Sequence, residues 1–309
     1  MSKTEWNLGL AQRKPLPGLN NLEALREDIQ ETLHKHPQLD LLVYPEMHLQ
    51  DVFAYPPDEH RQHMLNWATP LDGDLVRALG QLAHEFKIWL IPGSINESHQ
   101  GKLYNTELLI APSGHLQAAY RKMFPWRPHE PHDYGREFIT STIMHPSQVS
   151  DSAAAGQDQS SLTLGLSNCY DTWFPEHSRH LSWLGAQAII NIVKTTSDDR
   201  QQELILAQAN AISNQIYFFS VNCAEPLGRG GSIAVDPEGK ILAQAAGGEE
   251  TLLVQYSQEV LDRVRQEGTC GTNRIWHQFT AQDPPIALPM YSGQINPATW
   301  APSVQGAHS

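Results

Sequence analysis

Hydrophobic residues follow two alternating patterns along the chain. From Leu22 to Leu33 they are three or four residues apart, a spacing that places them on one face of a helix. The run from Leu39 to Tyr44 that follows is apolar at nearly every position, which is typical of a strand covered on both faces. The pattern therefore predicts a helix that leads into a buried strand.

This alternation continues along most of the chain and predicts an α/β fold with helices flanking sheet. Residues 108–116 and 233–242 are interpreted as hairpins, because proline fixes φ and glycine permits a positive φ at each turn. The other expected helices are residues 74–86, 175–184 and 201–214, and the other expected strands are residues 6–12, 88–95, 162–168, 188–193 and 217–222.

No linker rich in proline, glycine or serine divides the chain, so we expect one domain over residues 1–282. Residues 147–161 are rich in serine, alanine and glutamine without periodicity, and they predict a surface loop inserted before a strand. Proline, glycine, serine and glutamine dominate residues 283–309, which predicts a tail that is either loose or laid across a partner.

Composition narrows the class of protein. The chain has 309 residues, 40% of them hydrophobic, and a net charge of −13 at pH 7 without a basic stripe for a phosphate backbone, so we expect no nucleic-acid partner. No run approaches the roughly 20 apolar residues that span a bilayer. The first residues lack the apolar core of a secretory signal. We therefore expect a cytoplasmic protein with reduced thiols and no membrane partner.

Two polar residues follow buried strands, at the positions where doubly covered sheets bind their ligands. These residues are Glu46 and Cys169. Cys169 stands at a strand-to-helix turn, so the backbone N–H of Tyr170 is available to a developing oxyanion. A second interpretation stays open at this stage, because a free cysteine also packs as a small hydrophobic residue.

The remaining cysteines and the histidines give weaker signals. Cys223 ends a buried strand and Cys270 lies in a loop, and no two cysteines have the CxxC spacing of a zinc or redox site. Without a third ligand, histidines spaced along one helix face are typical of a solvated surface. We expect neither a metal nor a cofactor. The histidine pairs with that spacing are His60/His63 and His177/His180.

Four motifs change these interpretations because they occur together and in a fixed order. Considered alone, Lys122 and Glu130 are typical of solvated surface positions. The motif YPE carries Glu46, YRK carries Lys122, Glu130 follows eight residues later, and NCYDTWFPE carries Cys169. The ordered set resembles the nitrilase (carbon–nitrogen hydrolase) superfamily from Leu8 to about Leu253.

The resemblance implies a four-layer αββα sandwich, a homo-oligomer with an isologous interface, and a catalytic triad of Glu46, Lys122 and Cys169. It gives Glu130 a structural or substrate-orienting role, either by fixing Lys122 or by accepting a hydrogen bond from the substrate NH₂. The sequence leaves both roles open. The stretch from Tyr120 to Glu130 is similar to aliphatic amidases and formamidases.

The activity implied by the resemblance is hydrolysis of a small primary amide to a carboxylic acid and ammonia through a thioester on Cys169. Glu46 would serve as the general base, and Lys122 would favour the thiolate. The Lys122 ammonium and the Tyr170 backbone N–H would hold the oxyanion.

Several alternatives remain open. An N-carbamoyl (ureido) amidohydrolase or a nitrilase would use the same triad, and a catalytically silent family member would act as a binding protein. Trp126 and Trp173 are expected in the substrate pocket or, equally, in the core. Residues 147–161 depart from the family pattern beside the presumed pocket, so no substrate is carried over from one branch of the family.

Overall fold

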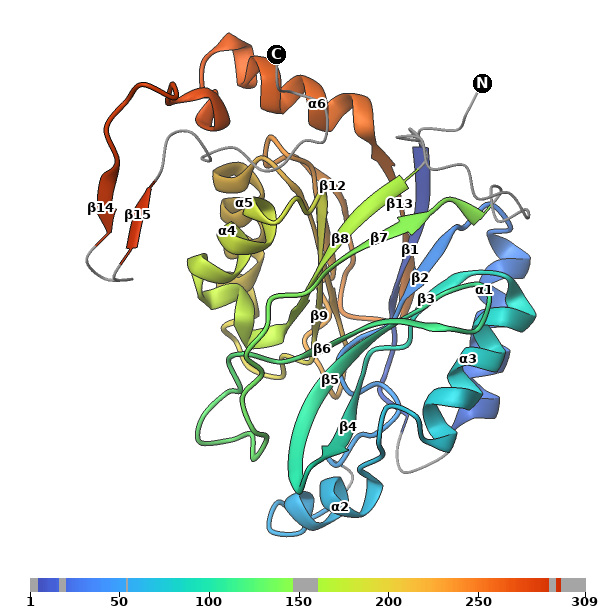
Figure 1. Ribbon diagram of the computed structural model, residues 1–309. Helices are drawn as coiled ribbons and strands as arrows, with labels where there is room; N and C mark the ends of the chain where they lie inside the picture. The colour runs from blue at the N-terminus through green and yellow to red at the C-terminus, as the bar shows by residue number, and fades with distance from the viewer. Residues whose placement is uncertain (1–4, 17–20, 54, 147–160, 289–292, 296–309) are drawn as a thin grey trace.

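The computed structural model describes residues 5–16, 21–53, 55–146, 161–288 and 293–295. Over these residues two large β-sheets face each other, and helices cover the outer face of each sheet (Figure 1). This arrangement confirms the four-layer αββα sandwich that the resemblance predicts.

The first sheet consists of seven strands within the described residues. They are β1 (Glu5–Gln12), β2 (Leu41–Val43), β3 (Trp89–Ile91), β4 (Ser94–His99), β5 (Lys102–Ile110), β6 (Leu116–Arg121) and β13 (Glu250–Ser257). Their order is β13-β1-β2-β3-β5-β4, with β6 paired to β5. β1, β2 and β3 are parallel, so their carboxyl ends lie at one edge of the sheet.

The second sheet has six strands in the described part of the chain. They are β7 (Thr140–Met144), β8 (Ser161–Asn168), β9 (Ala188–Val193), β10 (Tyr217–Asn222), β11 (Ile233–Val235) and β12 (Ile241–Gln244). Their order is β12-β11-β10-β9-β8-β7. The three central strands β8, β9 and β10 are parallel, so the residues that follow them also meet at one edge.

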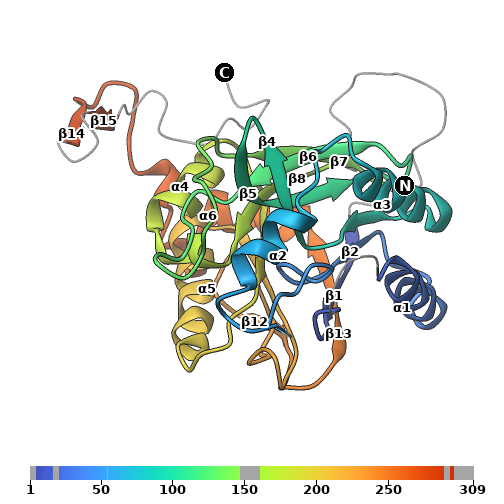
Figure 2. The ribbon, with the colours of Figure 1, turned by 90° about the horizontal axis from the view of Figure 1, so that it is seen from below.

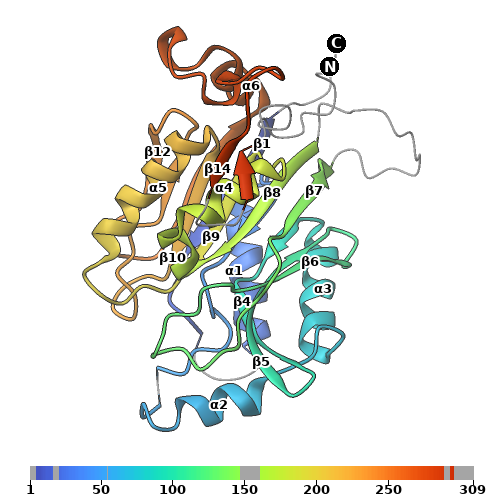
Figure 3. The same cartoon turned by 60° about the vertical axis from the view of Figure 1, so that its left-hand side comes forward.

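Two pairs of helices form the outer layers. α1 (Leu22–Lys35) and α3 (Asp74–Phe86) cover the first sheet, and α4 (Pro175–Trp183) and α5 (Arg200–Asn214) cover the second. Figure 3 shows α2 (His60–Trp67) and α6 (Gln258–Glu267) at opposite ends of the sandwich, and Figure 2 brings α2 to the front. No helix among the described residues combines the length and the apolar character needed to cross a membrane.

The apolar core divides into three clusters that follow these layers. β2 shows the division, because Leu41 and Val43 point into the cluster between the sheets whereas Leu42 points into the cluster under α1 and α3. A third cluster lies between the second sheet and the helices α4 and α5. Complete burial of one such side chain stabilises the fold by about 1.5–3 kcal/mol. The prediction of a strand covered on both faces is therefore confirmed.

The expected helices and both hairpins are confirmed, but the prediction of one strand over residues 88–95 is wrong. β3 ends at Ile91 and β4 starts at Ser94, and both pair antiparallel with β5, with the register displaced by one residue between them. Pro92 has no N–H to donate to a ladder, and Gly93 has a φ of +94°, which side chains disfavour. A Cβ on Gly93 would lie 2.1 Å from the carbonyl oxygen of Pro45. The break therefore lets the two backbones meet beside Glu46.

Three of the elements that were not predicted have a weak apolar pattern. No residue of α2 is buried, so α2 has no apolar face for a periodicity to record. β7 and β13 each alternate buried positions with more exposed ones, and the exposed positions of β13 include Leu253. An exposed leucine on an outer strand obscures the period of two.

The predicted surface loop over residues 147–161 lies outside the described residues, apart from Ser161, which begins β8. Met144 pairs with Ser161 at the amino end of β8, whereas Cys169 follows its carboxyl end. An eight-residue strand spans about 26 Å. The described residues that flank the segment therefore lie at the opposite end of β8 from Cys169.

Part of the predicted tail is ordered into strands. β14 (Ile286–Leu288) pairs antiparallel with β15 (Gly293–Ile295) and forms a separate two-stranded sheet. Figure 1 shows this pair standing away from the sandwich. Residues 286–288 and 293–295 are therefore paired strands within the predicted tail. The contact with a partner and the domain boundary at residue 282 stay predictions.

Candidate active site

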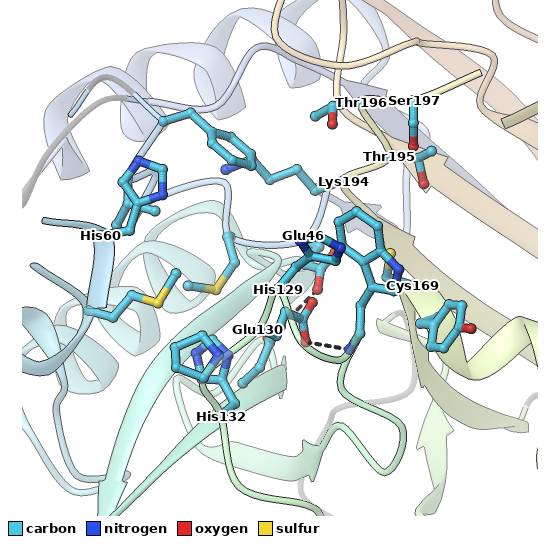
Figure 4. Close-up of a pocket in the computed structure, with 18 of the residues that line it drawn as sticks. Glu46, His60, His129, Glu130, His132, Cys169, Lys194, Thr195, Thr196 and Ser197 are labelled. Carbon is cyan, nitrogen blue, oxygen red and sulfur yellow. Dashed lines mark hydrogen bonds between the residues drawn. The ribbon is translucent and has the colours of Figure 1, made fainter. Parts of the chain in front are cut away.

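A cavity of about 510 Å³ opens where the carboxyl ends of β2, β8 and β9 meet (Figure 4). Sequence-predicted residues from distant segments line it, namely Glu46, Trp126, Glu130, Cys169 and Tyr170. The wall therefore combines two carboxylates, a thiol and two aromatic rings from both sheets.

Glu46 is placed by the loop that follows β2. The N–H of Tyr44 donates to the carbonyl of Ile91 at 2.8 Å, which extends the pairing of β2 to the start of this loop. The carboxylate is buried, and its Oε1 accepts from Lys122 Nζ at 2.9 Å and from Asn105 Nδ2 at 2.7 Å. The same oxygen of Glu46 thus accepts both hydrogen bonds.

Lys122 lies between the two glutamates. It follows β6 and is buried behind the cavity wall, where its Nζ is 2.6 Å from Glu130 Oε1 and 2.9 Å from Glu46 Oε1. The second oxygen of Glu130 accepts from the backbone N–H of Trp126 at 3.2 Å. Two roles were left open for Glu130. The structure contains the contact with Lys122 that the first role needs, and Glu130 also faces the cavity, as the second role needs.

The arrangement shifts the pKa values of Lys122, Glu46 and Glu130 by different amounts and in different directions. Burial lowers the pKa of Lys122, but the charges of Glu130 and Glu46 outweigh it and hold that pKa well above its usual value. Burial raises the pKa of Glu46 by more than the charge of Lys122 lowers it. Burial also raises the pKa of Glu130, but Lys122 outweighs it and the net shift is downward. Of the two glutamates, Glu46 is therefore the one that more readily takes up a proton.

Cys169 begins the 3₁₀ helix η2 (Cys169–Trp173) directly after β8. Its φ of +50° is unusual for a residue with a side chain, and such backbone strain is common where a reactive group must be presented. The side chain of Asn168 caps η2, and that of Asp171 accepts from the Asn168 N–H at 2.9 Å. The turn that presents the sulfur is thus fixed by hydrogen bonds on its inner side.

The thiol of Cys169 is not favoured as a thiolate in the resting site. Burial raises its pKa well above the usual value, the charge of Glu46 raises it further, and Lys122 lowers it by less than these two effects combined. Lys122 thus favours the thiolate, as expected, but by less than burial and Glu46 together disfavour it. A base must take the proton when the sulfur attacks.

Two asparagines connect Glu46 with the turn that carries Cys169. Asn168 Nδ2 donates to Asn105 Oδ1 at 3.0 Å, and Asn105 Nδ2 donates to Glu46 Oε1 at 2.7 Å. Sequence reasoning assigned Asn105 no role in the site. The available signal was the run of polar residues from Asn105 to Glu107, directly before the apolar residues that end β5.

A second group of polar residues lines the cavity after β9 and was missed. Glu203 accepts from Thr195 Oγ1 at 2.9 and 2.7 Å and from Arg200 Nη1 at 2.9 Å. Lys194 forms an ion pair with Asp51. Polar residues directly after a buried parallel strand were the signal that points to a ligand site here.

For Trp173 the sequence left the substrate pocket and the core equally open. Trp173 is absent from the cavity lining, because it lies one 3₁₀ turn beyond Tyr170, with its ring centroid 6.1 Å from that ring. Its Nε1 lies 3.5 Å from Glu203 Oε1. Trp126, by contrast, lines the cavity as predicted.

The histidine pairs do not converge on a common centre. His60 lines the cavity and bonds to the carbonyl of Tyr55 at 2.8 Å, whereas His63 packs its ring on Tyr55. His177 forms a hydrogen bond with the hydroxyl of Tyr120. Over the described part of the chain, no three His, Cys, Asp or Glu side chains are grouped as metal ligands.

The sequence profile of the carbon–nitrogen hydrolase family matches residues 10–266, and the chain belongs to this family. The crystal structure of Nit3 from Saccharomyces cerevisiae, described as a member of branch 10 of the nitrilase superfamily, superimposes with a TM-score of 0.71. The superposition covers 89% of this chain and 99% of Nit3, at 27% identity. The resemblance inferred from the four motifs is confirmed.

Relatives of known activity are amidases. The chain is 30% identical over 257 residues to the omega-amidase NIT3 of Saccharomyces cerevisiae, covering 80% of this chain and 84% of that protein. It is 29% identical to a formamidase of Pseudomonas syringae pv. tomato (78% and 68% covered) and 28% identical to an (R)-stereoselective amidase of Pseudomonas sp (74% and 77%). The protein is thus an amidase-type enzyme that acts on carbon–nitrogen bonds other than peptide bonds.

Proposed function

We propose that this enzyme hydrolyses a small primary amide to a carboxylic acid and ammonia through a thioester on Cys169. The observation that carries the proposal is the position of Lys122 between Glu46 and Glu130, directly behind the wall of the cavity that Cys169 lines. These groups supply a base, a cation and a nucleophile within one cavity.

In the first step the sulfur of Cys169 attacks the amide carbon while Glu46 takes the thiol proton. The raised pKa of Cys169 keeps the thiol protonated until then, and the raised pKa of Glu46 makes its carboxylate a stronger base. The carbonyl electron pair moves to the oxygen, where the Lys122 ammonium and the Tyr170 N–H stabilise the negative charge.

In the second step Glu46 returns the proton to the nitrogen, the carbon–nitrogen bond breaks and ammonia leaves. The thioester then reacts with water, whose proton passes to Glu46 as the oxygen attacks the carbonyl carbon. Collapse of this second intermediate breaks the carbon–sulfur bond. The acid is released, and Glu46 returns the proton to Cys169.

The role of Glu130 in this proposal is to fix Lys122. Its lowered pKa keeps it ionised, so it holds the ammonium in place while Glu46 changes its protonation state. Without that second carboxylate, Lys122 would be free to follow the charge on Glu46. Glu130 also faces the cavity, where it can accept from the substrate NH₂.

The amide class is supported by the names of the relatives, which include an omega-amidase, a formamidase and a stereoselective amidase. The cavity of about 510 Å³ is within the usual range for small-molecule sites. It has room for an acyl group that extends from Cys169 toward Trp126.

The test is ammonia release from three series of compounds, namely primary amides, ureido acids and nitriles. Release from amides with a transient acyl adduct in the intact mass supports the proposal. Carbon dioxide among the products would identify a carbamoyl substrate, and turnover of nitriles alone would identify a nitrilase. If no series gives ammonia or an adduct, a silent binding protein becomes the better account.

The matched variants are Cys169→Ala and Cys223→Ala. Cys223 is a buried thiol that does not line the cavity. We expect Cys169→Ala to abolish turnover and Cys223→Ala to retain it. Retention of most of the rate in Cys169→Ala would contradict the mechanism.

We also infer that the protein forms a homo-oligomer, as the resemblance implies. Two isoleucines of α5 support this, because Ile205 and Ile212 are 66% and 44% exposed on the outer layer. Sedimentation of the purified chain tests the oligomeric state, and a single species of monomer mass would contradict it.

A further inference from the structure

The proposed nucleophile and the proposed oxyanion cation come from different sheets. Lys122 follows β6 of the first sheet, and Cys169 follows β8 of the second. The cluster between the sheets is apolar, and apolar contacts have little directional preference. A reaction that needs two groups at a fixed separation requires a more specific connection.

Asp171 provides such a connection. Its Oδ2 accepts from Tyr120 Oη at 2.7 Å and from the Asn168 N–H at 2.9 Å, and its Oδ1 accepts from the Phe124 N–H at 2.9 Å. Tyr120 and Phe124 stand on either side of Lys122 in the sequence, and Asn168 immediately precedes Cys169. One buried carboxylate therefore holds the segments that carry both groups.

The direction of each hydrogen bond around Tyr120 is determined by its single proton. Asp171 has only acceptors, so the hydroxyl proton goes to Asp171. The hydroxyl oxygen then accepts from the Met123 N–H at 3.2 Å and from His177 Nε2 at 2.8 Å, which assigns the Nε2–H tautomer to His177. Burial and then the charge of Asp171 raise the pKa of Tyr120 well above its usual value, so the donor keeps its proton.

We propose that the hydrogen bond from Tyr120 to Asp171 is a positioning device that sets the distance between Lys122 and Cys169. The inference rests on the proposed function, since it assigns two positioning residues to that reaction. Neither Tyr120 nor Asp171 lines the cavity. Their effect on the reaction is exerted through the groups that they hold.

The test variant is Tyr120→Phe, and His177→Leu is its matched control. Tyr120→Phe keeps the ring in the core and removes only the oxygen that reaches Asp171. His177→Leu removes a buried hydrogen bond to the same oxygen but leaves the bond to Asp171 in place. A merely structural role predicts that the two variants lose activity in proportion to their loss of thermal stability.

We expect Tyr120→Phe to lower kcat/KM about 100-fold, mostly through kcat, because small displacements of reacting groups have effects of this size. We expect His177→Leu to stay within about threefold of the wild type. The second readout is the rate of Cys169 alkylation by iodoacetamide against pH. With Lys122 displaced, its lowering effect on the pKa of Cys169 is lost, and the midpoint should move to higher pH in Tyr120→Phe alone.

A double-variant cycle keeps the inference testable if Tyr120→Phe proves unstable. Asp171→Asn retains the shape but places an NH₂ against the donors of Asp171, and the double variant Tyr120→Phe/Asp171→Asn should lose no more activity than Asp171→Asn alone. Additive losses, or equal losses in Tyr120→Phe and His177→Leu, would overturn the inference. An inactive wild type, or an active Cys169→Ala, would instead overturn the proposed function.

Discussion

Two lysines lie beside the same cavity, Lys122 buried behind its wall and Lys194 in its lining, and their partners differ in number. Lys122 contacts two carboxylates, Glu46 and Glu130. Lys194 contacts one, Asp51. A single ammonium cannot neutralise two carboxylates, so the first cluster retains an acid that can take up a proton, whereas the second is balanced. The comparison teaches that proton transfer is possible where buried charges do not cancel, and that a balanced pair is suited to holding structure.

The largest expected effect comes from removing the uncancelled acid. Glu46→Gln should lower kcat/KM by about 10⁴-fold, at the upper end for a general base because Glu46 serves in both half-reactions. Asp51→Asn is the matched change in the balanced pair, and we expect its loss to be at least 100-fold smaller. Ammonia release measures both. Similar losses in the two variants would show that the two clusters do not differ in the way described.

The next effect comes from removing the shared cation. Lys122→Met should lower kcat/KM by about 10³-fold, since it removes an oxyanion donor and leaves two carboxylates without a counter-charge. Lys194→Met serves as the control for loss of a buried ammonium. Thermal melting of both variants separates misfolding from loss of catalysis. An equal loss of activity in folded Lys194→Met would contradict the assignment of the oxyanion cation to Lys122.

The pH profile sharpens the comparison further. Burial, opposed by Lys122 and assisted by Glu130, raises the pKa of Glu46 above its usual value. Because the base acts in its deprotonated form, kcat/KM should fall as the pH decreases through this pKa. Glu130→Gln removes the neighbouring negative charge, so the acid limb should move to lower pH. A limb that stays in place or moves upward would rule out coupling between the two glutamates.

Glu107 differs from both clusters, because it is a buried carboxyl that forms no ion pair with any described residue. Burial, and then the charge of Asp171, raise its pKa well above the usual value. Above the unfolded pKa of about 4.3, folding must therefore take up a proton, and stability decreases as the pH rises.

Glu107→Gln should accordingly increase the free energy of unfolding at pH 8 by roughly 1–3 kcal/mol, with little change in kcat/KM. The gain should disappear below pH 4, where the carboxyl is protonated in both states. Urea unfolding at pH 4, 6 and 8 measures this dependence. A gain that is the same at every pH, or a loss at pH 8, would show that Glu107 is ionised in the fold.

The buried elements could be predicted from the sequence, because a helix with one buried face has a period of 3.6 residues and a strand covered on both faces is a continuous apolar run. This applies to α1, α3 and the strands β2, β8, β9 and β10. It fails for α2, which buries no residue, and for residues 88–95, where Pro92 and Gly93 interrupt an apolar run.

The reacting groups were predictable because ordered motifs identify them, but their surroundings were not. The hydrogen bonds from Asn168 to Asn105 and from Tyr120 to Asp171 join residues 63 and 51 positions apart, across two sheets. No local pattern encodes such a contact. The raised pKa of Cys169 could not be predicted for a related reason, since the desolvation that causes it exists only in the folded cavity.

The close approach of Gly93 to Pro45 has a consequence for laboratory evolution. Any other residue at position 93 needs both a disfavoured φ and space that the carbonyl of Pro45 occupies. The displaced backbone would be the one that leads into Glu46. A mutational scan should therefore find position 93 almost as intolerant as the catalytic positions, although it contacts no substrate, and libraries that aim to change selectivity should leave it fixed.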